Sequence, residues 1–102
     1  MSLVFKNRKR AKQAERAIAK RLDGLRVGIL GAEDVLTEQF IIEVKTRKKF
    51  VALSWYQQAV KNAKKNKIPL LIVHISNKHH DNDLVILSLK DFEKLININK
   101  NP

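Results

Sequence analysis

Alternating apolar and polar residues in the middle of the chain predict a β-hairpin. A period of two over residues 40–46, FIIEVKT, puts Glu43 and Lys45 on the same face of a strand. The opposite face consists of Phe40, Ile42 and Val44. Asp34 lies one short turn upstream, so pairing of 32–36 with 40–46 would bring its carboxylate beside Glu43. The pattern therefore predicts two carboxylates and an ammonium group in one small site.

Hydrophobic spacing elsewhere predicts further helices and strands. Apolar residues recur at intervals of three and four in two long segments, so we expect helices at 5–22 and 53–66. The apolar face of the second helix is expected to comprise Leu53, Tyr56, Val60 and Ala63. Asp23-Gly24 is expected to end the first helix, with the glycine in the left-handed conformation. Further strands are expected at 25–30, 68–75 and 84–89, and a short closing helix at 91–96.

The order of these elements predicts an α/β fold. The short, almost continuously apolar segment 68–75 is typical of a strand buried on both faces. Strand, helix and strand over 40–75 would then form a right-handed parallel crossover. The length of 102 residues predicts a single domain, 1–102, with a frayed tail at 97–102. A core of this size would gain from a partner subunit.

Charge narrows the class of partner. The chain has 21 Lys and Arg against 10 Asp and Glu, a formal net charge of +11. Such a basic domain is expected to bind a polyanion, nucleic acid first, because phosphate contacts release counterions. No apolar run approaches the roughly 20 residues needed to span a bilayer, so we expect no membrane partner and a cytoplasmic location. The absence of cysteine excludes disulfides and thiolate zinc sites.

The predicted pairing of Asp34, Glu43 and Lys45 has a chemical use. Two carboxylates can hold Mg²⁺, and a neighbouring cation can orient an attacking water and offset charge on a phosphate. The alternative is that Glu43 and Lys45 form only the solvated face of an edge strand. Glu15, an acid beside the apolar stripe of the first helix, has the alternative of an intrahelical ion pair with Lys12.

Three other features have simpler interpretations. Adjacent His79 and His80 point in different directions and lack a third spaced ligand, which does not favour a metal site. His74 is expected to be a core histidine of the buried strand. Trp55 is expected to pack in the core or at an interface.

Taken in order, these motifs resemble the PD-(D/E)xK nuclease superfamily, and within it the small archaeal and phage Holliday junction resolvases. The similarity runs from about Arg8 to Val73. The matching segments are Ala14-Glu15, Glu33-Asp34, Ile42 to Lys48, and Trp55 to Ala59. The resemblance implies a restriction-endonuclease-like αβββαβ core with a central mixed sheet flanked by helices.

The resemblance also implies a role for each matching residue. Asp34 and Glu43 would bind Mg²⁺, with Mn²⁺ as a substitute, and the Val44 backbone carbonyl would be a further ligand. Lys45 would orient the nucleophilic water. Glu15 would complete the acidic cluster through water, and Gln58 would support the site from the second helix. Candidate phosphate contacts are Lys9, Lys12, Arg16, Arg47, Lys48 and Lys49.

The resemblance implies a homodimeric, structure-selective DNA endonuclease acting on four-way junctions in recombination and repair. Residue 33 is Glu where the superfamily name has Pro, and the segment 28–31 lacks the Ser-Gly loop of many archaeal resolvases. These departures put junction specificity in question more than nuclease chemistry. The alternatives are a nuclease acting on flaps or other DNA, and a non-catalytic basic nucleic-acid-binding module of the same fold. Cellular and viral origins both remain open.

Overall fold

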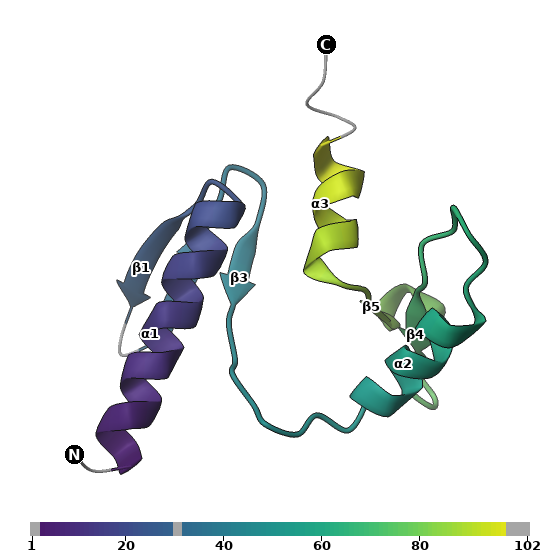
Figure 1. The fold of residues 1–102 in the computed structure, drawn as a ribbon, viewed down its shortest axis with the longest axis horizontal. Helices are drawn as coiled ribbons and strands as arrows, with labels where there is room; N and C mark the ends of the chain where they lie inside the picture. The colour runs from purple at the N-terminus through teal and green to yellow at the C-terminus, as the bar shows by residue number, and fades with distance from the viewer. Residues whose placement is uncertain (1–2, 30–31, 98–102) are drawn as a thin grey trace. The chain divides into compact units, whose positions relative to one another are not determined.

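The computed structural model describes residues 3–29 and 32–97 and forms two compact units (Figure 1). Unit 1 is Met1–Lys48 and unit 2 is Lys49–Pro102. Unit 1 contains helix α1 and strands β1, β2 and β3, which span Leu3–Arg21, Leu25–Ile29, Ala32–Leu36 and Ile41–Glu43. Unit 2 contains α2, β4, the 3₁₀ turn η1, β5 and α3, which span Leu53–Asn62, Leu71–Val73, His80–Asn82, Leu84–Ile86 and Leu89–Asn97.

The prediction of an α/β fold is confirmed in its coarse form, a mixture of helices and strands, while the parallel crossover over 40–75 stays a prediction. The elements from α1 to β4 follow the predicted order of helix, three strands, helix and strand. In the described residues, the strands form a three-stranded sheet, β1-β2-β3, and a two-stranded sheet, β4-β5, and both are antiparallel. The more specific mixed-sheet core and the single-domain organisation stay predictions.

Helix α1 ends just before Asp23-Gly24, as the sequence predicts, but the residue in the left-handed conformation is Asp23 and not Gly24. Asp23 takes the left-handed conformation, with φ of 56°, and the Gly24 N–H donates to the Ala19 carbonyl at 2.7 Å. This hydrogen bond is the six-residue closure of a Schellman motif. Gly24 is required for another reason: an added Cβ would lie 2.7 Å from the Leu36 carbonyl oxygen and 2.8 Å from Val35 Cγ1. The glycine therefore permits the close approach of β2.

Gly24→Ala is expected to lower the free energy of unfolding by about 1–3 kcal/mol, as an overpacked site does, because a backbone carbonyl must move to admit the methyl group. Urea unfolding followed by circular dichroism measures this change. Asp23→Gly is the matched control, since glycine adopts a positive φ readily and should leave stability unchanged or raised. Equal stability of Gly24→Ala and the parent chain would contradict the close approach.

The core of unit 1 lies between α1 and the three-stranded sheet. Helix α1 packs against β1 and β2, and Ala19 and Leu22 are buried on its inner face. Val35, in the central strand, is completely buried. Its cross-strand neighbours are Arg26 on β1 and Ile42 on β3, and these three positions define the face that α1 covers.

The β2–β3 hairpin is closed by one threonine. The Thr37 N–H donates to the Phe40 carbonyl at 2.8 Å, and Thr37 Oγ1 accepts hydrogen bonds from the N–H groups of Phe40 and Gln39 at 2.8 and 3.2 Å. A threonine hydroxyl that bonds nearby backbone groups stabilises a turn. The turn holds the register that pairs Leu36 with Ile41 and, one pair further on, Val35 with Ile42.

Unit 2 departs from the predicted pattern in its helix. Helix α2 ends at Asn62, not near 66, because Ala63 is extended (φ −70°, ψ 132°). Continuing the helix would have placed Lys61 within one turn of Lys64 and Lys65, where like charges repel. The least exposed positions are Ala52, Tyr56, Ala59 and Ala63. The apolar face is therefore rotated from the predicted one, and Leu53 and Val60 remain 45% and 47% exposed.

Strand β4 also differs from the prediction. It covers only Leu71–Val73 and pairs antiparallel with β5. Ile72 and its cross-strand neighbour Val85 are 53% and 54% exposed, so the expectation of a strand buried on both faces is wrong. The short antiparallel pair buries one face only, as isolated hairpins do.

The closing helix begins earlier than predicted. Ser88 caps α3, since its Oγ accepts the Asp91 N–H at 3.1 Å. Leu89, predicted to end a strand, is therefore the first helical residue, and the helix continues to Asn97. The Ser88 N–H donates to the Tyr56 hydroxyl at 3.1 Å, which ties the start of α3 to α2. Residues 98–102 of the predicted tail lie outside the described residues.

Candidate active site

The β2–β3 hairpin brings Asp34 and Glu43 to the same point of the sheet. Their Cα atoms are register partners, as the sequence predicts. Directly opposite residues of an antiparallel pair lie on one face of a sheet, close enough for their side chains to interact. Two carboxylate-bearing positions therefore adjoin at the edge strand of unit 1.

Lys45 lies on the same face as Glu43. Its Nζ is 2.9 Å from Glu43 Oε1, and the two side chains are 63% and 57% exposed. The intervening Val44 is half-buried, as are Phe40 and Ile42. The predicted alternation along this strand is confirmed. An exposed pair of this kind contributes about 0.2–1 kcal/mol to stability, so it orients the two side chains more than it holds the fold together.

Glu15 has a different environment. Its side chain is 6% exposed, and its Oε2 lies 3.4 Å from Nη2 of Arg26 on β1. Arg26 is the register partner of Val35, on the face that α1 covers. Glu43 occupies the alternate position and lies on the other face. The structure therefore gives Glu15 a buried contact between helix and sheet and does not bring it onto the face of Glu43 and Lys45.

Sequence reasoning missed Arg26 as a partner of Glu15. The two residues are 11 positions apart, and only Lys12 was available within one helical turn. The register that pairs Arg26 with the buried Val35 places Arg26 on the face that α1 covers, and the sequence did not supply that register. The catalytic role of Glu15 stays a prediction, beside a structural role that the ion pair supports.

Gln58 belongs to unit 2 and lies exposed on α2. Its Nε2 donates to Asn62 Oδ1 at 3.3 Å, a contact between residues one turn apart. Trp55, on the same helix, is 54% exposed and is not a core residue of this unit. The support of Gln58 for the site, and the Val44 carbonyl as a metal ligand, stay predictions.

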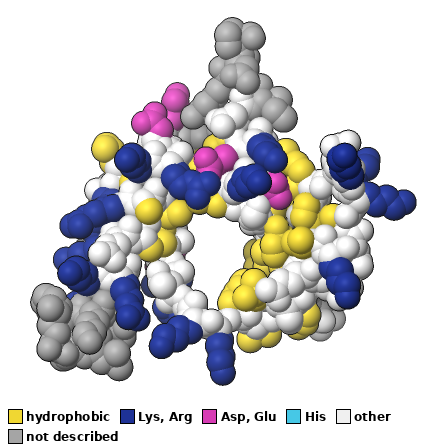
Figure 2. Space-filling view, viewed as in Figure 1, with side chains coloured by type: hydrophobic (Ala, Val, Ile, Leu, Met, Phe, Trp, Pro, Cys, Tyr) yellow, Lys and Arg dark blue, Asp and Glu magenta, His cyan; other side chains and the backbone are white. Residues whose placement is uncertain are grey.

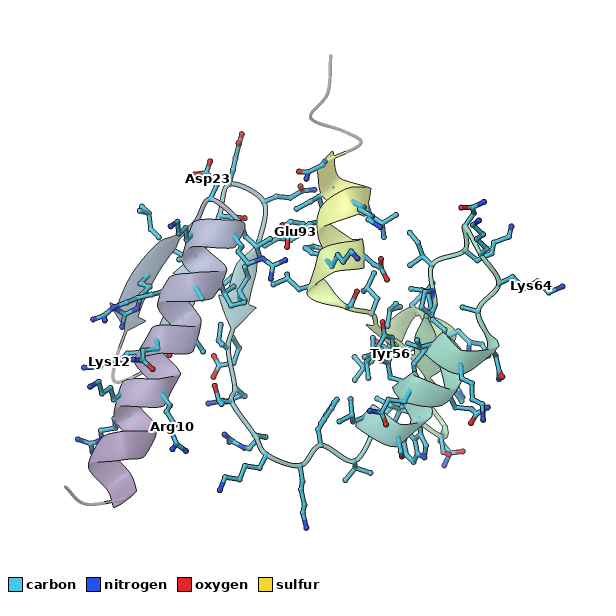
Figure 3. All side chains as sticks on the ribbon, viewed as in Figure 1. Arg10, Lys12, Asp23, Tyr56, Lys64 and Glu93 are labelled. Atoms are coloured by element: carbon cyan, nitrogen blue, oxygen red, sulfur yellow. The ribbon has the colours of Figure 1, made fainter. Side chains whose placement is uncertain are left out.

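The candidate phosphate contacts are all exposed. Lys9, Lys12 and Arg16 are spaced at three and four residues along α1, so they lie along one side of the helix. Figure 2 shows basic side chains over α1 and over the segment after β3, and Figure 3 labels Lys12 on the helix. That segment carries Arg47, Lys48 and Lys49, of which Arg47 also donates to the Thr46 carbonyl at 2.8 Å. Two exposed basic groups therefore flank the β-hairpin in sequence.

Comparison of the chain with protein-family models, with curated proteins and with solved structures finds no match. In the part of the chain that the structure describes, no helix is long and apolar enough to cross a membrane.

Proposed function

We propose that this protein is a Mg²⁺-dependent, structure-selective DNA endonuclease of the PD-(D/E)xK type. The observation that carries the proposal is the pairing of Asp34 with Glu43 on the face where Lys45 lies 2.9 Å from Glu43. Two acidic residues at paired positions and one neighbouring ammonium group match the requirements of metal-assisted phosphodiester hydrolysis. The element order from α1 to β4 supports a restriction-endonuclease-like αβββαβ core. The mixed sheet of that core is part of the proposal, since the described strand pairs are all antiparallel.

The residues present fit a hard divalent cation. Carboxylate oxygens are the donors that Mg²⁺ prefers, and an open surface lets it keep several waters. Asp34 and Glu43 would hold the ion, and the bound ion would supply charge stabilisation at the scissile phosphate. Lys45 neutralises Glu43 in the structure described. With Glu43 bound to a metal cation, the Lys45 ammonium group would be available to orient water or to contact a phosphate oxygen.

The charge of the chain supports DNA as the substrate. A net charge of +11 and the exposed basic residues of α1 and residues 47–49 favour a polyanion. The four-way junction is the substrate that the resemblance to resolvases implies. A homodimer with two-fold symmetry would supply two sites related as the paired cuts require.

A cleavage assay tests this proposal. The full chain is incubated with a fixed four-way junction, and with linear duplex, flap and single-stranded DNA of the same length, in Mg²⁺, Mn²⁺ or EDTA. We expect symmetric cuts in the junction that need the metal, and a dimer in sedimentation. Preferred cleavage of flaps or single strands would leave a nuclease and remove the resolvase. Tight DNA binding without cleavage in either metal would favour the non-catalytic binding module.

A further inference from the structure

A second cluster of metal-ligating side chains lies in unit 2, at the end of the β4–β5 hairpin. His74 follows the last residue of β4, and Asp83 precedes the first residue of β5. The register pairs Val73 with Leu84, and its extension by one residue sets His74 opposite Asp83. The 3₁₀ turn η1 adds His80, because side chains three residues apart in such a turn lie on the same side.

The three side chains meet at the carboxylate of Asp83. His74 Nδ1 lies 2.6 Å from Asp83 Oδ1, and His80 Nδ1 lies 2.9 Å from Asp83 Oδ2. The imidazole rings lie next to each other, with centroids 4.3 Å apart and planes tilted by 36°. The Asp83 side chain is 13% exposed, whereas those of His74 and His80 are 43% and 84% exposed. The cluster is therefore anchored on a nearly buried carboxylate and opens to solvent on the histidine side.

This geometry overturns one expectation from the sequence and gives His80 partners that the sequence did not indicate. His74 was expected in the core of a strand buried on both faces, yet it is exposed beyond the end of β4. Adjacent His79 and His80 lack a third spaced ligand in the sequence, and the hairpin places His74 and Asp83 beside His80. His79 itself is not part of the cluster, whose ligand atoms all lie within 4.8 Å of one another.

We propose that His74, His80 and Asp83 bind one Zn²⁺ ion. Two imidazoles and a carboxylate are a donor set for zinc, not for Mg²⁺, which prefers oxygen ligands alone. Zinc–nitrogen and zinc–oxygen bonds of about 2.0–2.2 Å place tetrahedral ligand atoms about 3.3 Å apart. The nitrogen–oxygen contacts of 2.6 and 2.9 Å, one to each oxygen of Asp83, would widen by about 0.7 and about 0.4 Å to reach this spacing, and all the ligand atoms lie within 4.8 Å of one another. The contacts with Asp83 thus bring the three side chains together before the ion binds.

Three protein ligands leave the fourth coordination position to solvent. The ion would join the end of β4, the turn η1 and the start of β5, which are elements of one unit. Binding to the folded state alone raises stability, so zinc should also protect this hairpin against unfolding. The site does not share a residue with the proposed nuclease centre.

The experiment is a titration of the full-length, tag-free protein with ZnCl₂ alone, read by competition with a chromophoric chelator and by ¹⁵N shifts of the imidazole nitrogens. We expect one equivalent to bind and to shift the nitrogens of His74 and His80. His80→Ala and Asp83→Asn should each weaken binding at least tenfold, since even an outer-shell partner changes affinity by about 10–100-fold. The side chain of His80 is mostly exposed, so its removal leaves folding intact.

Two controls separate this site from others. His79→Ala removes an exposed neighbouring histidine outside the cluster and should leave the affinity unchanged. Glu43→Gln, in the other unit, should also leave it unchanged. An equal loss on replacing His79, or full affinity in His80→Ala and Asp83→Asn, would overturn the proposal. In that case the cluster is a hydrogen-bonded clasp between the two strands.

Discussion

Glu43→Gln is expected to abolish Mg²⁺-dependent DNA cleavage while DNA binding persists or tightens. The substitution keeps the shape of the side chain but removes the carboxylate of one of two acidic residues that are register partners on the β2–β3 hairpin. Metal-ion charge stabilisation is worth several kcal/mol, and each 1.36 kcal/mol is tenfold in rate. A loss of about 100-fold or more in the single-turnover rate is therefore expected. Binding should not weaken, because a negative charge facing the phosphates is lost.

The fold should survive this substitution. Glu43 is 57% exposed, and its pair with Lys45 is a surface pair of small energetic value. Asp34→Asn should give the same loss of cleavage. Glu38→Gln is the matched control, since Glu38 is an exposed acid in the turn between the same two strands. Undiminished cleavage by Glu43→Gln and Asp34→Asn would remove these residues from the active site. An equal loss in Glu38→Gln would assign the effect to the charge of the hairpin as a whole.

Unit 1 follows from its sequence because short-range patterns determine it. The three- and four-residue apolar spacing of α1 and the period of two from Phe40 to Lys45 each identify a buried face directly. The intervening turn is short enough that Thr37 fixes the register. Asp34 and Glu43 could therefore be paired before any coordinates were known. The partner of Glu15 could not, because Arg26 reaches it across an interface between helix and strand.

Unit 2 was less predictable because its apolar residues exceed what its small sheet covers. A run such as Ile68 to Ile75 is typical of a strand with two buried faces, but β4 has one neighbour and only three residues. The more apolar helix face, with Leu53 and Val60, is not the one that is covered, and the packing around Ala52 and Tyr56 selects the neighbouring face. The cluster of His74, His80 and Asp83 depends on the antiparallel register of β4 with β5, which no pattern in the sequence indicated.

Raising the salt concentration from 50 to 200 mM is expected to weaken DNA binding by about 10³-fold. Each phosphate contact contributes about −0.9 to the slope of log affinity against log salt on duplex DNA, so six contacts give a slope of about −5. The six residues are Lys9, Lys12, Arg16, Arg47, Lys48 and Lys49, all of them exposed. Fluorescence anisotropy with labelled DNA in EDTA, over a series of salt concentrations, measures the slope. A nearly flat dependence would contradict an electrostatic interface.

Replacing Lys48 and Lys49 together by Ala tests which cations contribute. Removal of two phosphate contacts should make the slope shallower by about 2 and weaken binding most at low salt, where electrostatic contributions are largest. The matched control replaces Lys64 and Lys65, two adjacent exposed lysines beyond the end of α2, of which Lys64 is labelled in Figure 3. Both double variants lose the same net charge. An equal change in slope would therefore mean that DNA responds to the total charge of the chain, whereas a change confined to Lys48 and Lys49 would place phosphates beside the segment that follows Glu43 and Lys45.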